Sequence, residues 1–184
     1  MIYLFRSGID PKIVEIREGE VVLQEVEIRF LIRKFPSSFF SLELALKWLR
    51  EIEMKLAKAK AYRLLAIRSY PSDALLEKLE EKGFSKVVSE QIVGEFKTLG
   101  YIEDDSYWTN FIEREFQRGY GPKYLQWKKG APAEKIRDLI TPAMQQKKIR
   151  ELAKKFPSPK KAAAALLRRG FDLDSIRKEI DIFS

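Results

Sequence analysis

The sequence contains neither cysteine nor histidine. Without cysteine, the chain can form no disulfide and no zinc site with thiolate ligands. Without histidine, it lacks the commonest general base, the usual partner of a serine nucleophile and the commonest metal ligand. Catalysis would have to rest on carboxylates, lysine or tyrosine. These absences predict a protein that is not an enzyme and that uses no cofactor and no metal.

Long apolar segments are also missing. No run of apolar residues reaches the roughly 18 residues that a membrane-spanning helix needs. The first ten residues, MIYLFRSGID, lack the basic start and the long apolar stretch of a signal peptide. The sequence therefore predicts a cytoplasmic protein with no membrane partner.

Charge, in contrast, is abundant. The 184 residues include 35 Lys and Arg against 27 Asp and Glu, which gives a net charge of +8. The excess is concentrated near the C-terminus, where residues 147–184 hold 11 basic and 5 acidic side chains. Such a region predicts a polyanionic partner, either nucleic acid or an acidic protein surface. A solvated basic face that binds no partner is the alternative.

The first third of the chain carries strand patterns followed by a helical pattern. KIVEIRE (12–18) alternates apolar and polar residues, VVLQEVEIRFLI (21–32) is rich in β-formers, and Gly19 lies between them. This arrangement predicts a β-hairpin. Apolar residues then recur every three or four positions toward Arg68, which predicts a long amphipathic helix on which the hairpin packs. The recurring residues are Leu42, Ala45, Leu49, Ile52, Leu56 and Ala59.

Proline and glycine punctuate the chain after residue 70. Proline is favoured at the first helical position, because the N–H that it lacks has no partner there. Glycine just past an apolar run ends a helix in left-handed backbone. The alternation of the two predicts a string of short helices with tight turns. The prolines are Pro122, Pro132, Pro142 and Pro159, and the glycines are Gly83, Gly100, Gly119, Gly130 and Gly170.

The same punctuation repeats along the chain. LLEKLEEKGF (75–84) resembles AALLRRGF (164–171), and LQWKKGA (125–131) is a third version. Repeated helical units cannot bury their apolar faces alone and must stack on their neighbours. We therefore expect a mainly α fold, an elongated array of about three degenerate three-helix repeats with a small N-terminal β-hairpin and long helix. The expected parts are an N-terminal extension (1–53) and helical repeats 1 (54–102), 2 (103–148) and 3 (149–184).

Two adjacent aspartates, Asp104 and Asp105, lie in LGYIEDDSYWTNF (99–111), just before an apolar helical face. A catalytic or metal-binding pair would need a positioned partner or a third acid at helical spacing. Aspartate at the start of a helix caps exposed N–H groups and complements the helix dipole. We predict that the two aspartates are caps. Phe84, Tyr101 and Phe171, which follow turn glycines, are predicted core anchors.

Four motifs in order, over roughly residues 54–184, resemble the RecX family of bacterial regulators of the RecA recombinase. They are RSYPSDALLEKLEEKGF (68–84), LGYIEDDSYW (99–108), GYGPKYLQWKKGA (119–131) and LLRRGFDLDSI (166–176). The departures fall on packing positions: Ser89 stands where the family usually has isoleucine, and Gln126 and Trp127 stand near a usual leucine. They indicate a divergent member with a shifted core.

The resemblance implies a non-enzymatic modulator with no small-molecule substrate. RecX-like proteins bind the groove of the RecA filament on single-stranded DNA and limit its extension or activity in recombination and the SOS response. Binding to free single-stranded DNA is expected to be weak and non-specific, and whether the protein restrains or assists RecA stays open. The alternative is a stand-alone DNA-binding regulator, either sequence-independent or reading duplex DNA through a helix-turn-helix-like pair such as 122–140.

Basic residues and interleaved tyrosines in repeats 2 and 3 are the candidate site for RecA or DNA. Lysine or arginine on phosphate adds salt-dependent affinity without reading sequence, and tyrosine can stack on bases or on protein side chains. For any one basic residue, ordinary solvent exposure is the competing explanation. The candidates are Arg114, Arg118, Tyr120, Lys123, Tyr124, Lys128, Lys129, Lys154, Lys155, Lys160, Lys161, Arg168 and Arg169.

Overall fold

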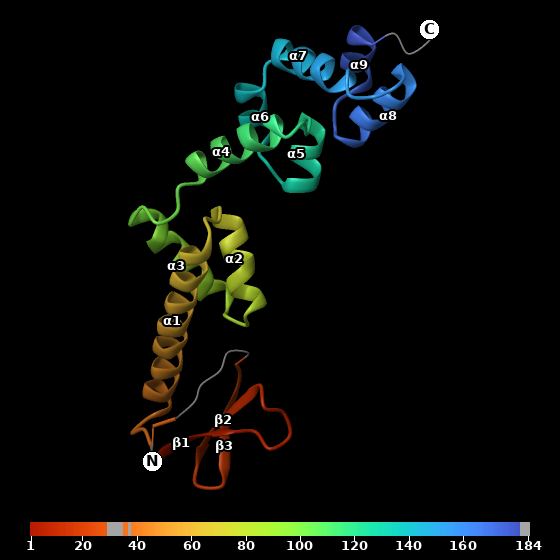
Figure 1. Ribbon diagram of the computed structural model, residues 1–184. Helices are drawn as coiled ribbons and strands as arrows, with labels where there is room; N and C mark the ends of the chain where they lie inside the picture. Colours follow the sequence, from red (N-terminus) through yellow and green to blue (C-terminus); the bar gives the residue numbers. More distant parts are fainter. Residues whose placement is uncertain (29–34, 37, 181–184) are drawn as a thin grey trace. The chain divides into compact units, whose positions relative to one another are not determined.

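The computed structural model describes residues 1–28, 35–36 and 38–180 (Figure 1). In these residues the chain is mainly helical, with a small antiparallel sheet at the N-terminus, which confirms the predicted fold class. It divides into two compact units, Met1–Glu103 (unit 1) and Asp104–Ser184 (unit 2). The elements of unit 1 are β1 (Ile2–Arg6), β2 (Ile13–Glu18), β3 (Val21–Glu27), α1 (Leu42–Ile67), α2 (Ser72–Glu81) and α3 (Lys86–Thr98). Those of unit 2 are α4 (Asp104–Gln117), α5 (Pro122–Lys129), α6 (Ala133–Leu139), α7 (Pro142–Ala153), α8 (Pro159–Arg168) and α9 (Leu173–Glu179).

The N-terminal sheet has the strand order β1-β2-β3, and both strand pairs are antiparallel. The predicted hairpin is confirmed as β2 and β3, joined at Gly19, whose φ is 60°. Residues 29–32 of the predicted second strand lie outside the described residues. The sequence did not predict β1, because its five residues become a strand through pairing with β2, as in Leu4 opposite Ile16. A third strand helps the sheet to be stable, since an isolated hairpin is marginal in water.

The core of unit 1 lies between one face of the sheet and the helices. Val14 and Ile16 of β2 are fully buried in the same cluster as Ala45 of α1, and α1, α2 and α3 pack on one another. The predicted stripe on α1 packs against the core from Leu42 to Leu56, and the fully buried positions in the second half of the helix are Ala57 and Ala61. Leu56 is half-buried and Ala59 is exposed. Alanine at both buried positions lets the backbone of a neighbouring helix approach closely.

Unit 2 contains two groups of three helices that share one core. Helices α4, α5 and α6 pack on one another, and so do α7, α8 and α9. Buried side chains from all six form a single cluster, so neither group has a separate core. The largest buried members are Phe116, Phe171, Ile112, Leu125, Ile149, Leu166, Ile136 and Ile176. The residue limits expected for the three repeats stay predictions.

Helix starts and stops follow the predicted punctuation closely. All five predicted stop glycines have positive φ, and three of the four prolines are the first residues of α5, α7 and α8. Pro132 differs: it is the residue before α6, with an extended ψ of 130°. That position also requires no N–H from proline.

Of the three predicted core anchors, two are confirmed. Phe84 and Phe171 are buried, with exposed fractions of 8% and 1%. Tyr101 is 52% exposed, so its prediction was wrong. The next residue, Ile102, takes the buried position, and the ring of Tyr101 lies against Tyr62, with 5.4 Å between ring centroids. The turn at Gly100 places both Tyr101 and Ile102 near the core, and only the packing decides which of the two side chains is buried.

Candidate nucleic-acid interface

The start of α5 is locked to the turn between α8 and α9 by close backbone contact. The N–H of Gly121 donates to the carbonyl of Arg169 at 2.7 Å, and the N–H of Lys123 donates to the carbonyl of Gly170 at 3.1 Å. A Cβ atom added at Gly121 would lie 2.6 Å from the backbone of Gly170, and one added at Gly170 would overlap the backbone of Tyr124. Glycine is therefore required on both sides. We call this contact the glycine interlock; it joins two of the motifs found in the sequence.

The surface of α5 beside this interlock carries aromatic and basic side chains together. The rings of Tyr120 and Tyr124 are stacked, with centroids 4.2 Å apart and planes 15° from parallel. Lys129 Nζ lies 5.8 Å from the centroid of the Tyr124 ring, and Lys123 Nζ lies 6.0 Å from that of Trp127. Cations at this distance are attracted to ring faces. We define the α5 surface as Tyr120, Lys123, Tyr124, Trp127, Lys128 and Lys129. Tyr120 lies just before α5, and both tyrosines are half-buried against the core of unit 2, whereas Trp127 and the three lysines are exposed.

The candidate arginines are partly engaged within the protein. Glu115 is buried, and its Oε1 accepts from Arg118 at 2.8 Å and from Arg114 at 3.2 Å. A guanidinium of Arg169 donates to the carbonyl of Arg118 at 3.4 Å. Arg114 and Arg118 thus pair with an acid of their own helix, and Arg169 links the end of α8 to the end of α4. Their charge is therefore less available to a partner than the charge of the lysines.

The candidate lysines between the end of α7 and the start of α8 are exposed. Lys154 directly follows α7 as its C-terminal cap residue, where the helix dipole favours a cation. Lys160 and Lys161 lie in the first turn of α8, where the dipole disfavours one. Within the described part of the chain, none of Lys154, Lys155, Lys160 and Lys161 forms an ion pair. Arg168 is also exposed and donates to the carbonyl of Ala164 at 3.4 Å.

Formal charge differs sharply between the two units. Unit 2 has 18 Lys and Arg against 11 Asp and Glu, a net of +7, whereas unit 1 has 17 against 16. Nearly all of the chain's net charge therefore belongs to the unit that contains the candidate residues. A field of one sign at a surface raises the local concentration of oppositely charged partners and speeds their association.

Asp172, a neighbour of the candidate site, has a shifted ionisation. It caps α9, with Oδ1 accepting the N–H of Ser175 at 2.9 Å. Burial raises the pKa of Asp172, but the hydrogen bonds from Ser175 and the nearby Lys123 ammonium lower it more, so its pKa lies below the usual value. The positive charge of Lys123 thus favours the ionised form of this cap.

The aspartate pair lies at the start of a helix, as predicted: Asp104 and Asp105 are the first two residues of α4. That their side chains cap its N–H groups stays a prediction. The favourable interaction with the helix dipole is available in this first turn. Asp105 also forms an ion pair with Lys135 of α6. The two residues are 30 positions apart in the sequence, so only the fold brings them together. In the described residues, no three acidic side chains are grouped so as to hold a metal ion.

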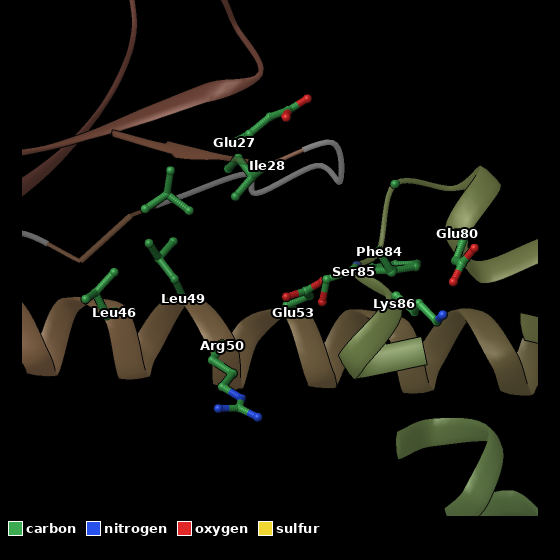
Figure 2. Close-up of a pocket in the computed structure, with 12 residues that line it drawn as sticks. Glu27, Ile28, Leu46, Leu49, Arg50, Glu53, Glu80, Phe84, Ser85 and Lys86 are labelled. Carbon is green, nitrogen blue, oxygen red and sulfur yellow. The ribbon is translucent and has the colours of Figure 1, made fainter. Parts of the chain in front are cut away.

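An open groove of about 500 Å³ lies in unit 1, between the end of β3, α1 and the α2–α3 turn (Figure 2). Leu46 and Leu49 rise from α1 toward Ile28, and Arg50 points away from them. Glu53 has a structural role, because its Oε1 accepts a hydrogen bond from the N–H of Ser85 at the start of α3, at 2.6 Å. The rim carries both signs of charge, from Glu27, Glu80 and Lys86 among others. The groove offers no concentration of positive charge comparable to that of unit 2.

Sequence reasoning missed one residue of the α5 surface, Trp127. It was treated as a substitution near a packing position, yet it is 73% exposed. The signal that could have found it is its spacing from Leu125. Leu125 is fully buried, and residues two positions away on either side, Lys123 and Trp127, fall on the opposite side of a helix with 3.6 residues per turn.

The described residues form a mainly helical protein whose second unit carries most of the net positive charge. No family model matches the chain. A regulatory protein RecX from Legionella pneumophila (strain Corby) is 34% identical over 134 residues, covering 64% of this chain and 88% of the relative. One from Thermus thermophilus is 32% identical over 122 residues, covering 64% of this chain and 84% of the relative. The chain belongs to the RecX family of regulatory proteins.

Solved structures agree with this assignment at the level of the fold. The crystal structure of RecX from Lactobacillus salivarius has a TM-score of 0.59 and 21% identity, covering 70% of this chain and 95% of that one. A crystal structure of a regulatory protein RecX has a TM-score of 0.61 and 16% identity, and covers 97% of both chains. The described helices include none with the length and apolar character needed to cross a membrane.

Proposed function

We propose that this protein is a non-enzymatic regulator that binds the RecA filament on single-stranded DNA and limits the extension or activity of that filament. The observation that carries the proposal is the concentration of net charge on unit 2, with exposed lysines on α5 and α8 and at the end of α7. The relatives are named regulatory proteins, and the sequence motifs resemble those of a family that acts on RecA. A filament that holds DNA presents phosphates, which are the natural partners of such a surface.

The lysine pairs are the residues expected to make these contacts. Lys128 and Lys129 end α5, and Lys160 and Lys161 lie in the first turn of α8. All four are exposed, so their charges contribute little to folding stability. Each contact with phosphate releases counterions, and affinity then falls as salt rises. The proposed interface should therefore depend strongly on ionic strength and weakly on DNA sequence.

Charge reversal tests this proposal. K128E/K129E and, separately, K160E/K161E should leave the melting temperature nearly unchanged and should weaken binding to RecA-coated single-stranded DNA. The difference from wild type should shrink as salt rises, because screening shortens the reach of each charge. The measurement is a competition between labelled RecA-coated and bare DNA at two salt concentrations.

A matched control lies in unit 1. K55E/K82E makes the same change in charge at two exposed positions, one on α1 and one just after α2. It should bind filaments as the wild type does. An equal loss in the control variant would show that only total charge matters and would contradict the assigned surface. Tight, sequence-selective binding to bare duplex, without any response to RecA, would favour the alternative of a stand-alone DNA-binding regulator.

A further inference from the structure

Trp127 stands apart from the other two tryptophans of the chain. Trp48 and Trp108 are half-buried, and their rings contact other aromatic rings. Trp127 is 73% exposed, and within the described residues its ring meets the ammonium group of Lys123 rather than another ring. Most of this indole does not contribute to the core of unit 2, so packing alone does not account for its place on α5.

Two lysines lie next to Trp127 on the helix. Lys123 lies one helical turn earlier, with Nζ 6.0 Å from the ring centroid, and Lys128 is the next residue. Residues three or four apart are neighbours on a helix surface, so Tyr124 is adjacent as well. Flat aromatic surface next to positive charge is the combination with which proteins bind single-stranded nucleic acid: bases stack on the rings and the backbone phosphates meet the cations.

The helix that presents Trp127 has defined ends and is fixed to its surroundings at its first turn. Pro122 begins α5, and Gly130, with φ 71°, ends it. The glycine interlock fixes the first turn to the turn between α8 and α9 through two backbone hydrogen bonds. A ring on a fixed helix loses little conformational freedom when a ligand binds, so more of the contact energy appears as affinity.

We infer that Trp127 stacks on an unpaired base of single-stranded DNA while Lys123 and Lys128 contact the flanking phosphates. This inference rests on the proposed function and adds to it a base contact that lysines cannot make. Base stacking tolerates any sequence, because every base has a flat face. Bases of a duplex are already stacked inside the helix, so the surface should prefer single-stranded DNA to duplex of equal length.

The fluorescence of tryptophan provides the test. Wild type, W127L, W127F, W108F and K128E/K129E are titrated with an oligothymidylate of about 20 nucleotides, which exceeds a typical single-strand site, and with a duplex of the same length. In the wild type the oligothymidylate should quench tryptophan emission more strongly than the duplex does. W108F should keep this quenching, and W127L and W127F should lose it. W127L should bind the oligothymidylate roughly 5- to 160-fold more weakly, the range expected for one stacked base, and W127F should recover part of that loss.

Salt dependence separates the ring from the charges. W127L removes no phosphate contact, so the slope of log affinity against log salt should match that of the wild type. K128E/K129E should make that slope shallower and should still show quenching at saturation. Unchanged melting temperatures would confirm that each variant is folded.

The outcomes distinguish this inference from the proposed function. No binding of the wild type to the oligothymidylate at low salt, quenching that persists in W127L, or equal affinity of W127L and wild type would overturn the stacking role. Loss of filament binding by K128E/K129E would support the proposed function in any of these cases. If quenching requires Trp127 but charge reversal leaves filament binding unchanged, base stacking stands and the filament proposal fails. A W127L variant that loses only filament binding would make Trp127 a protein contact and would overturn the inference.

Discussion

Unit 1 and unit 2 both contain helices that pack in threes, but only unit 2 carries a substantial net charge. Unit 1 adds a three-stranded sheet to its helices and joins α1 to α3 through side chains, as in the ion pair between Lys58 and Glu95. Unit 2 joins its two groups of helices through backbone contact at the glycine interlock. The comparison shows that similar helical motifs can build two different units. Unit 1 is packed and nearly neutral, and unit 2 presents a rigid basic surface.

The two buried phenylalanines that follow turn glycines should show the largest effects. F84A and F171A should each lower the free energy of unfolding by about 3–5 kcal/mol, because each leaves a cavity in a packed core. Phe84 belongs to the core of unit 1 and Phe171 to that of unit 2. Urea unfolding gives the size of each loss, and hydrogen exchange shows where protection is lost. A loss of protection in the wrong unit would contradict the separation of the two cores.

The glycine interlock should show the next largest effects. G170A adds a Cβ that overlaps the backbone of Tyr124, at a residue with φ 85°, and we expect a loss of about 2–4 kcal/mol from overpacking and strain. G121A lacks the strain and should cost about 1–3 kcal/mol. Gly94 in α3 is the matched control, because a Cβ there meets nothing within 4 Å. G94A should stabilise unit 1 by about 0.5–1 kcal/mol. Equal effects at Gly94 and Gly121, measured by urea unfolding, would show that the close contact is absent.

A smaller effect is expected when Asp172 is protonated. Its folded pKa lies below the unfolded value of about 4, so the ionised carboxylate is favoured in the folded state. The stability that it contributes is therefore complete above about pH 4 and is lost as the pH falls through the folded pKa. D172A should lower the free energy of unfolding by about 1 kcal/mol at neutral pH and should lose less on acidification than wild type. Unfolding curves at several pH values test this, and parallel curves for both proteins would contradict it.

Ser89 should give the smallest effect. It is fully buried on α3, and its hydroxyl has no hydrogen-bond partner among the described residues. A buried unpaired hydroxyl costs roughly 1–3 kcal/mol, and alanine removes it with little change of shape. S89A should therefore raise the free energy of unfolding of unit 1 by up to about 1 kcal/mol. A clear loss of stability would reveal a hydrogen bond at this hydroxyl.

Much of the fold could be predicted because it depends on local rules. The prolines and glycines marked helix ends correctly, since fixed or permissive backbone dihedrals act within a few residues. Predictions that needed a distant partner were less successful. Strand β1 exists because β2 lies beside it, and Tyr101 is exposed because Ile102 occupies the core. On α1, Ala59 is exposed and Ala57 and Ala61 are buried for the same reason.

In the candidate site, too, the sequence showed what depends on residue type and missed what depends on distant contacts. Its lysines were visible in the sequence as clustered charge, since exposure is the ordinary state of lysine. The sequence did not show that the arginines are less available to a partner than the lysines. This difference depends on Glu115, a buried acid that Arg114 and Arg118 both contact. Trp127 was assigned to packing because apolar residues on a helix usually face the core, and the structure places it in solvent.

The sequence by itself determined the class of this protein: the helical repeats, the excess of positive charge toward the C-terminus and the absence of cysteine and histidine. These properties follow from residue type and from local backbone preferences. Only the tertiary structure decided that Gly121 and Gly170 face each other, that Asp105 reaches Lys135, and that Trp127 stands exposed beside Lys123. Contacts between residues far apart in the chain, and the side of a helix that is left uncovered, depend on how the helices pack together, which no local pattern contains.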